Sequence, residues 1–272
     1  MGNLMAVDFY KIFRTKSFYV IGAILLAITV LNSAVICSGY IWAYEEQLSN
    51  MANTASSFGS SFGNAWSIIF SSFSNISSLV AMMSILFMCS EFSFGTMKNI
   101  ASKGYSRMGI YLSKFLISAL CLCIYFVLTF ITSFVTCVVV VGNRVPNFFN
   151  LPTHMFLPLF FVLLFLLVDI SFALMVSSLV RKSGQAIATY IVPTLITSIL
   201  LSILDINLFK NILKTDFRLS DYVYTSCLSE VLRSNLITQM CYNDILRYSL
   251  VALVFLLVTM LVGIYFFKKR DI

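Results

Sequence analysis

Charged side chains are scarce in this sequence. Asp, Glu, Lys and Arg together make up 11% of its 272 residues, whereas hydrophobic residues make up 60%. Soluble domains have on average about 25% charged and about 45–50% apolar residues. So few charges cannot solvate the surface of a water-soluble globule of this length, and the mean hydropathy of +0.94 is typical of a chain that uses lipid as its solvent. The composition therefore predicts a membrane protein.

Signatures of nucleotide and zinc chemistry are also missing. The sequence contains no Gly-x-x-x-x-Gly-Lys-Ser/Thr loop, which cradles nucleotide phosphates, and no His-Glu-x-x-His pair, which binds zinc. Its single histidine, His154, lies near the expected outer edge of a span, where an interfacial role is the simpler interpretation. We therefore expect a chain that is not an enzyme and that binds no metal or cofactor itself.

The basic residues give the chain a formal net charge of +7 but form no continuous basic face. They come in small groups between apolar runs, a distribution typical of the loops that flank membrane spans. A nucleic-acid-binding surface would instead gather basic residues along one face. We therefore expect no nucleic acid among the partners.

The seven cysteines show no spacing that indicates a metal site. Five of them fall within or beside apolar runs, where a thiol behaves as a small hydrophobic group: Cys37, Cys89, Cys121, Cys123 and Cys137. Cys227 and Cys241 share a polar segment, and a disulfide between them requires that this segment face an oxidising exterior. The disulfide is therefore a hypothesis that depends on topology.

Six stretches are long and apolar enough to cross a bilayer as helices. About 20 apolar residues are needed, because a helix rises 1.5 Å per residue and the hydrocarbon layer is about 30 Å thick. The second stretch is rich in serine, which suits a helix beside a polar path better than one in lipid. The sequence thus predicts an all-α membrane protein, a single transmembrane domain over 1–272, with spans at 18–41, 66–90, 114–141, 156–180, 185–204 and 248–267.

Lys and Arg are distributed unevenly between the two sides of the membrane. Cytoplasmic loops retain positive charge, so the richer side faces the cytoplasm. With six spans both termini fall on that side, and we expect both to be cytoplasmic. The richer side carries twelve of the 18 basic residues: Lys11, Arg14, Lys16, Lys98, Lys103, Arg107, Lys114, Arg181, Lys182, Lys268, Lys269 and Arg270.

Two segments outside the spans have amphipathic patterns. Residues 1–17 carry apolar side chains at helical spacing (Met5, Phe9, Ile12 and Phe13), which predicts a helix lying on the inner leaflet. The alternative is a cytoplasmic extension of the first span. Residues 205–247 mix apolar and charged residues, and we expect an extracellular loop with short helices on the outer surface.

The inner loop at 91–107 has the pattern of a short capped helix. Thr96 is suited to start the helix, and Gly104 to the left-handed conformation that ends one. Met97, Ile100 and Ala101 would form an apolar stripe between these ends. A short amphipathic helix on a cytoplasmic loop indicates a docking surface.

The charges of this inner loop have more than one interpretation. Lys98, Lys103 and Arg107 are explained by topology alone if they do no more than mark the loop as cytoplasmic. Glu91 is more informative, because a carboxylate at the end of an apolar span has a desolvation cost that pairing with Arg107 or Lys98 would offset. An unpaired interfacial glutamate is the alternative.

The same loop resembles that of a known family. The pattern Glu91-x-x-x-Gly95-Thr96-x-Lys98, followed by Ser106-Arg107 and Lys114, resembles the one after the second span of bacterial type-2 ATP-binding-cassette (ABC) exporter permeases. The family often has proline before the Ser-Arg pair, where this chain has Gly104-Tyr105. The number of spans, the N-terminal helix and the long fifth loop are also similar over the whole chain.

The resemblance implies a partner and a mechanism. It implies that the inner helix is a coupling helix seated in a groove of a separate P-loop ATPase subunit, which would bind ATP and Mg²⁺. Two ATPase subunits would work with two permease chains, identical or homologous. The coupling residues implied by the resemblance are Glu91, Gly95, Thr96, Lys98, Ser106 and Arg107.

Asp169 and Pro193 are the outliers within the spans. An ionisable residue near the middle of a span is costly unless it faces protein or water. Asp169 would therefore line the translocation path, pair across a dimer interface, or only join helices through hydrogen bonds. Pro193 favours a kink in the fifth span, as in a helix that lines a cavity.

The combined features favour a permease subunit of a bacterial ATP-driven exporter in the plasma membrane. Its size and long fifth loop look most like exporters that confer immunity to antimicrobial peptides (lantibiotics) or that secrete peptides or other amphipathic compounds. One alternative is an ion-coupled secondary transporter that uses Asp169 as the carrier site. Another is a non-transporting membrane scaffold or sensor, with the outer loops as the binding surface.

Overall fold

The computed structural model describes residues 2–50, 65–142, 156–180, 182–205, 219–232 and 242–269. Of these residues, 94% are helical and none lies in a β-strand. Six of the helical stretches are long and apolar enough to cross a membrane. The prediction of an all-α protein with six spans is confirmed.

The first half of the chain contains three of these spans. An N-terminal helix α1 (Gly2–Arg14) precedes α2 (Lys16–Asn50), the first span. The second span consists of α3 (Ala65–Ser72) and α4 (Ser74–Ser93), separated at Phe73. A short helix α5 (Thr96–Ser102) leads into α6 (Arg107–Val141), the third span. Helix α6 begins seven residues before the start expected at 114.

The second half contains the other three spans and an outer helix. Helices α7 (Phe156–Leu179) and α8 (Ser183–Leu204) are the fourth and fifth spans, and α10 (Tyr242–Lys269) is the sixth. Between α8 and α10 lie a 3₁₀ turn η2 (Leu219–Tyr222) and the helix α9 (Tyr224–Leu232). The sixth span begins before the expected residue 248. Helix α10 starts at Tyr242, so Tyr248 lies inside the helix, where its side chain is buried.

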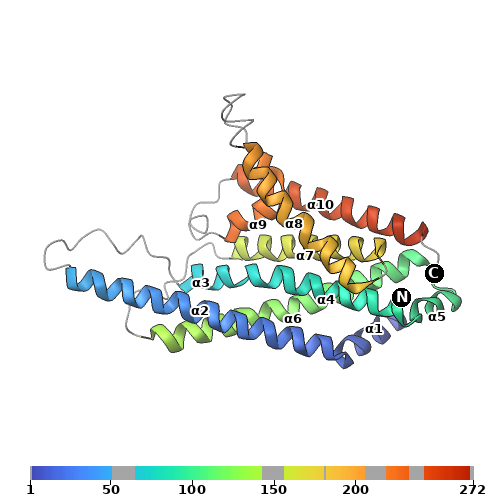
Figure 1. The fold of residues 1–272 in the computed structure, drawn as a ribbon, viewed down its shortest axis with the longest axis horizontal. Coiled ribbons are helices and arrows are strands. Elements are labelled where there is room, and N and C mark those ends of the chain that lie inside the picture. The colour runs from blue at the N-terminus through green and yellow to red at the C-terminus, as the bar shows by residue number, and fades with distance from the viewer. Residues whose placement is uncertain are drawn as a thin grey trace.

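The spans lie side by side along the long axis of the molecule, and both termini and α5 are at the same end (Figure 1). The second span, with α4, and the fourth span, α7, form the centre of the bundle. In the most apolar 18-residue stretch of each, 61% of the residues are buried. Helices α2 and α6 pack together on one side of this centre, and α10 packs against α7 on the other. The serine-rich second span is therefore a central helix.

Helix α1 turns away from α2 at Thr15 (Figure 1). Its Ile12 is fully buried, whereas Val7, Phe9 and Tyr10 are exposed. Helix α1 is thus separate from the first span rather than a straight extension of it. Its position in the membrane interface stays a prediction.

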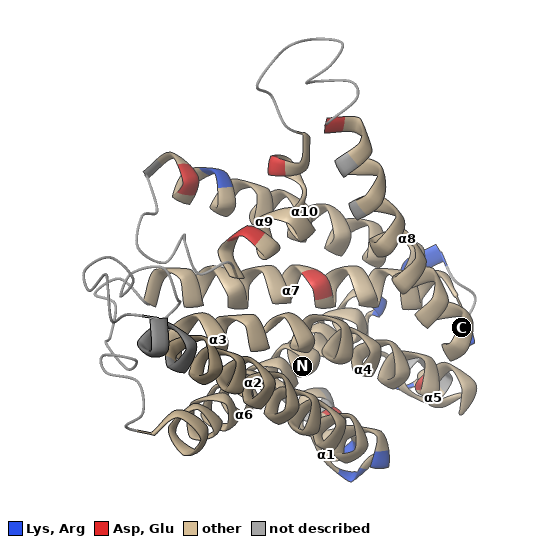
Figure 2. Cartoon of the chain, turned by 60° about the vertical axis from the view of Figure 1, so that its left-hand side comes forward, with Lys and Arg blue, Asp and Glu red and all other residues tan. Residues whose placement is uncertain are grey.

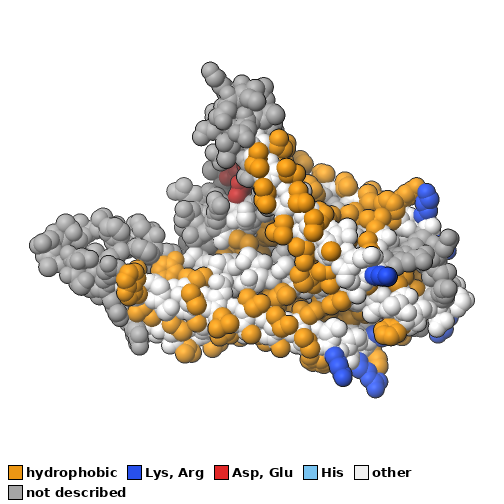
Figure 3. Space-filling model, in the orientation of Figure 1, with side chains coloured by type: hydrophobic (Ala, Val, Ile, Leu, Met, Phe, Trp, Pro, Cys, Tyr) orange, Lys and Arg blue, Asp and Glu red, His pale blue; other side chains and the backbone are white. Residues whose placement is uncertain are grey.

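Apolar side chains also cover much of the surface of the bundle, while basic side chains gather at the end that carries the termini (Figure 3). Helix α8 contributes an exposed apolar face that includes Val192, Leu195 and Ile199. Exposed apolar surface of this extent requires lipid or another protein as its surroundings. These surfaces fit a multi-pass membrane protein.

Candidate functional site

Four charged side chains from three helices meet at the end of the bundle near α5. Lys114 on α6 places its Nζ 2.6 Å from Oδ1 of Asp8 on α1 and 2.6 Å from Oε2 of Glu91 on α4. The second ion pair of Glu91 joins its Oε1 to Lys11 Nζ at 3.3 Å. We call these four residues the inner ion cluster. Figure 2 colours the charged residues of the chain, including those of α1 and of the end of α4.

The inner ion cluster is electrically balanced, and all of its members except Lys11 are buried. Asp8 and Lys114 are fully buried and Glu91 is 5% exposed. Two ammonium groups balance two carboxylates, which is the condition under which buried charges are tolerated. The Ser113 hydroxyl adds a hydrogen bond to Asp8 Oδ2 at 3.1 Å, and Lys114 Nζ lies 4.7 Å from the centre of the Phe87 ring. The cluster therefore ties α1, α4 and α6 together.

The pairing of Glu91 differs from the one expected from the sequence. We predicted Arg107 or Lys98 as its partner, but its carboxylate contacts Lys11 and Lys114. Arg107 instead donates from Nη1 to the carbonyl of Lys268 at 2.6 Å, which joins the start of α6 to the end of α10. The side chain of Lys98 lies outside the described residues. The prediction for Arg107 was wrong because Lys114, eight residues into α6, is inside the bundle and closer.

Two glycines shape the connection that holds α5. Gly95 (φ +67°) precedes this helix and Gly104 (φ +83°) follows it, both in the left-handed region that favours glycine. The Thr96 hydroxyl donates to the carbonyl of Glu91 at 3.2 Å, so the first residue of α5 is bonded to the last turns of α4. Ser106 then caps α6 by accepting a hydrogen bond from the Gly109 amide at 3.2 Å.

Asp169 lies in the middle of the bundle and accepts hydrogen bonds from three hydroxyl groups. Ser77 on α4 donates to its Oδ2. Tyr190 on α8 and Tyr224 on α9 donate to Oδ1, at 2.8 and 3.3 Å. The carboxylate is 3% exposed, and no Lys or Arg within the described ranges forms an ion pair with it. We call these four residues the Asp169 cluster.

The Asp169 cluster connects four helices, including the outer helix α9. Hydroxyl donors replace water around the carboxylate, which lowers the cost of burying it. Figure 2 shows the acidic residue of α7 within the bundle, away from the charges at its ends. The geometry fits an aspartate that joins helices. A role in a translocation path stays a prediction.

Helix α9 was expected on the outer surface, but one of its faces packs into the bundle. Tyr224, Cys227, Leu228 and Val231 are buried, and α9 contacts α7, α10, α3 and α8. Arg247 at the start of α10 holds this region through ion pairs with three carboxylates: Asp221 at 3.4 Å, Glu230 at 3.1 Å and Asp244 at 3.6 Å. The outer helix is therefore docked between spans.

The remaining sequence candidates are placed as follows. Pro193 lies inside α8, which runs unbroken from Ser183 to Leu204, and a kink there stays a prediction. Cys227 is buried, forms no disulfide with another described residue, and lies with Sγ 3.2 Å from the carbonyl of Asp221, to which it donates as a thiol. Cys241 lies outside the described residues, so the disulfide also stays a prediction. Among the described residues, no group of three His, Cys, Asp or Glu side chains is arranged to hold a metal ion.

Four members of these clusters were not singled out from the sequence: Asp8, Ser77, Tyr190 and Tyr224. Asp8 lies in the segment expected as an N-terminal helix, and Tyr224 in the segment expected as an outer loop. Their partners lie 106 and 55 positions away along the chain. Lys114 was the signal that could have pointed to Asp8. A lysine directly before a long apolar run becomes buried if its helix begins earlier, and a buried lysine needs a carboxylate partner.

The six spans, packed around the central helices α4 and α7, define a multi-pass helical membrane protein. Residues 3–272 match a family model described as ABC-2 family transporter protein. The chain therefore belongs to the ABC-2 transporter family, the membrane components of ABC transporters. In this family ATP is used by a partner ATP-binding subunit and not by the permease. No curated protein matches the chain.

Proposed function

We propose that this chain is the permease of a bacterial exporter that moves a peptide, an antimicrobial or another amphipathic compound outward across the plasma membrane. It works as one of two permease chains with two ATPase subunits, and both of its termini are cytoplasmic. The observation that carries the proposal is the position of α4. Its last turns are bonded to α5 and to the inner ion cluster, and its first turn is bonded to Asp169 through Ser77.

Helix α4 would transmit movement from the ATPase to the outer side. Glu91 and Ser77 are 14 residues apart on this helix, which corresponds to about 21 Å at 1.5 Å per residue. Closure of the ATPase dimer would push α5, and the Thr96–Glu91 bond passes the displacement to α4. Because Glu91 is also paired with Lys11 and Lys114, the inner ends of α1, α4 and α6 move together.

At the other end of this path the Asp169 cluster acts as a latch. Tyr224 bonds α9 to the same carboxylate that Ser77 of α4 contacts. A shift of α4 that carries the Asp169 carboxylate along with Ser77 lengthens the bond from Tyr224 to this carboxylate, and α9 is then released from its position between the spans. Coupling of this kind requires an element with two arrangements, which α9 supplies in this proposal.

The second permease chain would pack against the side of the bundle that contains α8. The apolar window of α8 is only 18% buried within one chain, and its exposed face includes Val192, Ile196 and Ile203. A face of this kind suits a helix that meets either lipid or a matching helix. A path between two copies would then run beside α4 and α8, the helices that hold Ser77 and Tyr190.

The proposal is tested by purifying the chain with its candidate ATPase and measuring ATP hydrolysis. Lys98→Glu reverses a charge within α5 and Arg107→Glu reverses one at the first residue of α6. We expect both to lower ATPase recovery and stimulation at least several-fold. Lys269→Glu makes the same charge change at the end of α10 and is the matched control. Equal recovery and stimulation in all three variants would contradict a coupling role for α5.

A second candidate function is a secondary transporter, for which the buried carboxylate of Asp169 is the supporting observation. Inverted vesicles separate the two. Uptake that requires ATP and the ATPase subunit and persists with a protonophore supports the exporter. Uptake that follows a proton gradient without ATP supports the alternative.

A further inference from the structure

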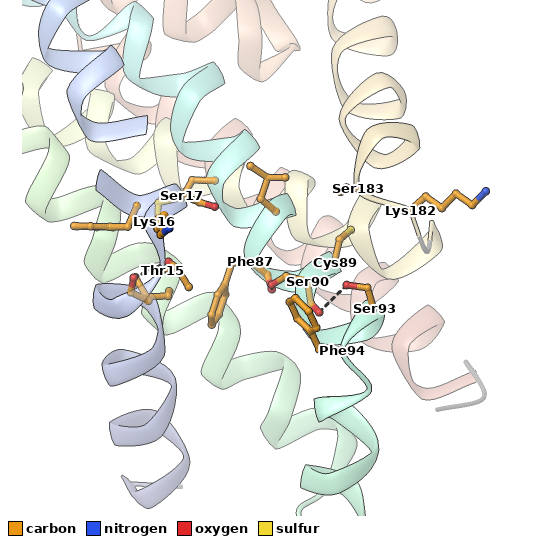
Figure 4. Close-up of a pocket in the computed structure, with 14 residues that line it drawn as sticks. Thr15, Lys16, Ser17, Phe87, Cys89, Ser90, Ser93, Phe94, Lys182 and Ser183 are labelled. Atoms are coloured by element: carbon orange, nitrogen blue, oxygen red, sulfur yellow. Dashed lines mark hydrogen bonds between the residues drawn. The ribbon is translucent and has the colours of Figure 1, made fainter. Parts of the chain in front are cut away.

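A cavity of about 600 Å³ opens beside the inner ion cluster, at the end of the bundle that carries the termini. Three parts of the chain line it: the junction of α1 and α2, the last turns of α4 and the start of α8 (Figure 4). This volume lies within the range of about 300–1,000 Å³ that is typical of pockets for small ligands. Ser93 and Phe94 at the start of the inner loop also line it, but none of the implied coupling residues and no member of the Asp169 cluster does.

The rim of the cavity is basic. Lys16 is the first residue of α2, and Lys182 directly precedes α8. Both side chains are exposed, and within the described ranges neither forms an ion pair. Figure 4 shows Lys182 pointing outward from the start of α8. A ligand in the cavity requires this side chain to turn inward, a rotamer change that exposed side chains make freely.

Hydroxyl groups lie between the two lysines and the interior. Thr15 and Ser17 flank Lys16, and Ser183 follows Lys182. The Thr15 hydroxyl already donates to the Ile12 carbonyl at 2.7 Å, so Ser17 and Ser183 are the hydroxyl groups that would donate to a ligand. The first turns of α2 and α8 border the same space, and first-turn amides have no partner within their own helix. The rim therefore offers positive charge together with hydrogen-bond donors, which is the chemistry that recognises a phosphate group.

The interior of the cavity is mainly apolar, and the hydroxyl groups of Ser90 and Ser93 in its lining donate to backbone carbonyls of α4. Phe18 from α2 and Met83, Leu86 and Phe87 from α4 form its wall. A small soluble anion such as phosphate gains nothing from such a wall. A molecule with an anionic head and a hydrocarbon chain satisfies the rim and the wall together.

The position of the cavity matches the depth of lipid headgroups. Lys16 begins the first span, and Lys182 immediately precedes the fifth. Each is therefore at the boundary between the hydrocarbon layer and water. Basic pockets between transmembrane helices at this depth bind anionic headgroups.

We propose that this cavity binds one anionic phospholipid, with its phosphate between Lys16 and Lys182 and its acyl chain along Phe87 and Met83 of α4. The bound lipid joins the α1–α2 junction to the start of α8 across the inner end of α4. It thereby stabilises the region around the inner ion cluster. This site does not depend on the cargo or on ATP, so it stands or falls separately from the proposed function.

The test uses the full-length chain in nanodiscs of phosphatidylcholine with phosphatidylglycerol added in steps. Native mass spectrometry counts the phosphatidylglycerol molecules that the released protein retains. We expect one tightly held molecule in the wild type. In the double variant Lys16→Glu/Lys182→Glu its affinity should fall about thirty-fold, the change that corresponds to about 1 kcal/mol for each of two lysines near an anionic lipid.

Two further variants make the result specific. Lys268→Glu/Lys269→Glu changes the net charge equally at the same end of the bundle and should leave the tight site within two-fold of the wild type. Ser90→Trp fills the cavity without changing charge and should abolish the tight site. Equal losses in both double variants, or tight retention in Ser90→Trp, would overturn the proposal.

The source of the phosphate is tested by competition. Inorganic phosphate and glycerol phosphate at millimolar concentration should leave the retained phosphatidylglycerol unchanged. Displacement by either compound would show a site for a soluble anion and overturn the assignment to lipid. Equal retention of phosphatidylcholine would overturn the assignment to an anionic headgroup.

Discussion

Lys114 Nζ on α6 lies 2.6 Å from Asp8 Oδ1 on α1, and both side chains are completely buried. Glu91 completes the arrangement from α4, with its own oxygen 2.6 Å from the same ammonium. A buried ion loses several kcal/mol of hydration free energy, which only close partners offset. The N-terminal helix is therefore held against the bundle by a charge network and not only by its apolar face.

Removal of the shared cation should destabilise the protein strongly. Lys114→Gln leaves Asp8 buried without a countercharge, and we expect the free energy of unfolding to fall by about 3–5 kcal/mol. Thermal unfolding of the purified chain in detergent measures the change. Lys103→Gln, at an exposed lysine, is the control and should stay within about 0.5 kcal/mol of the wild type.

The two buried partners should also depend on each other. In a double-mutant cycle, Asp8→Asn combined with Lys114→Gln should cost less than the sum of the single changes by about 1–3 kcal/mol, because the second change removes a charge that the first left unpaired. The same unfolding measurement provides all four values. Additive losses would mean that the ion pair contributes little to stability.

The sequence predicted the spans well and the charge network poorly, for one physical reason. A span is visible in the chain because about 20 consecutive apolar residues define it locally. The Asp8–Lys114 pair joins positions 106 residues apart and depends on how α1 folds back against α6. The sequence placed Lys114 at the flank of a span. Its helix starts earlier, at Arg107, so Lys114 lies inside the helix instead.

Gly104 shows the opposite case, since a local rule sufficed. A glycine that ends a helix in the left-handed conformation is a property of a few adjacent residues, and Gly104 has the predicted conformation. The burial of α9 was not predictable in this way. Its mixed composition fits an exposed amphipathic helix equally well, and only packing against α7 distinguishes the two.

The Tyr224 hydroxyl should contribute to holding α9 in place. Tyr224→Phe removes one of the three donors to Asp169, and a hydrogen bond to a charged group is worth about 1.5–3 kcal/mol. We expect amide hydrogen exchange in α9 to accelerate about ten-fold or more. Tyr265→Phe, at an exposed tyrosine of α10, should leave the exchange of α9 unchanged. An unchanged rate in Tyr224→Phe would contradict the latch.

Gly263 on α10 gives Tyr111 of α6 the space for its ring. A Cβ atom at this glycine would lie 2.2 Å from the tyrosine oxygen and 2.7 Å from Cζ. The ring is fully buried and cannot move aside without repacking. Gly263→Ala should therefore lower the free energy of unfolding by about 1–3 kcal/mol, despite the better helix propensity of alanine.

Gly39→Ala is the matched control for this substitution. Gly39 lies within α2, and no atom within 4 Å would meet a Cβ added there. Alanine should leave the protein unchanged or stabilise it by up to about 1 kcal/mol. Comparable losses at both glycines in thermal unfolding would show that the contact between α6 and α10 is not the cause.

The Cys227 thiol should resist alkylation as long as α9 stays docked. Burial raises the pKa of Cys227 to about 12, whereas a free cysteine has a pKa of about 8.5. Because only the thiolate reacts, its small fraction at pH 8 should make labelling by iodoacetamide slow in the folded protein, and the rate should increase with pH up to about 12. Mass spectrometry of the labelled peptide measures the rate, and rapid labelling of the folded chain at pH 8 would contradict the burial of this thiol.

In denaturant without a reductant, Cys227 should become reactive if it is free. If it is bonded to Cys241, it should stay unlabelled until a reductant is added, so the same experiment decides the disulfide.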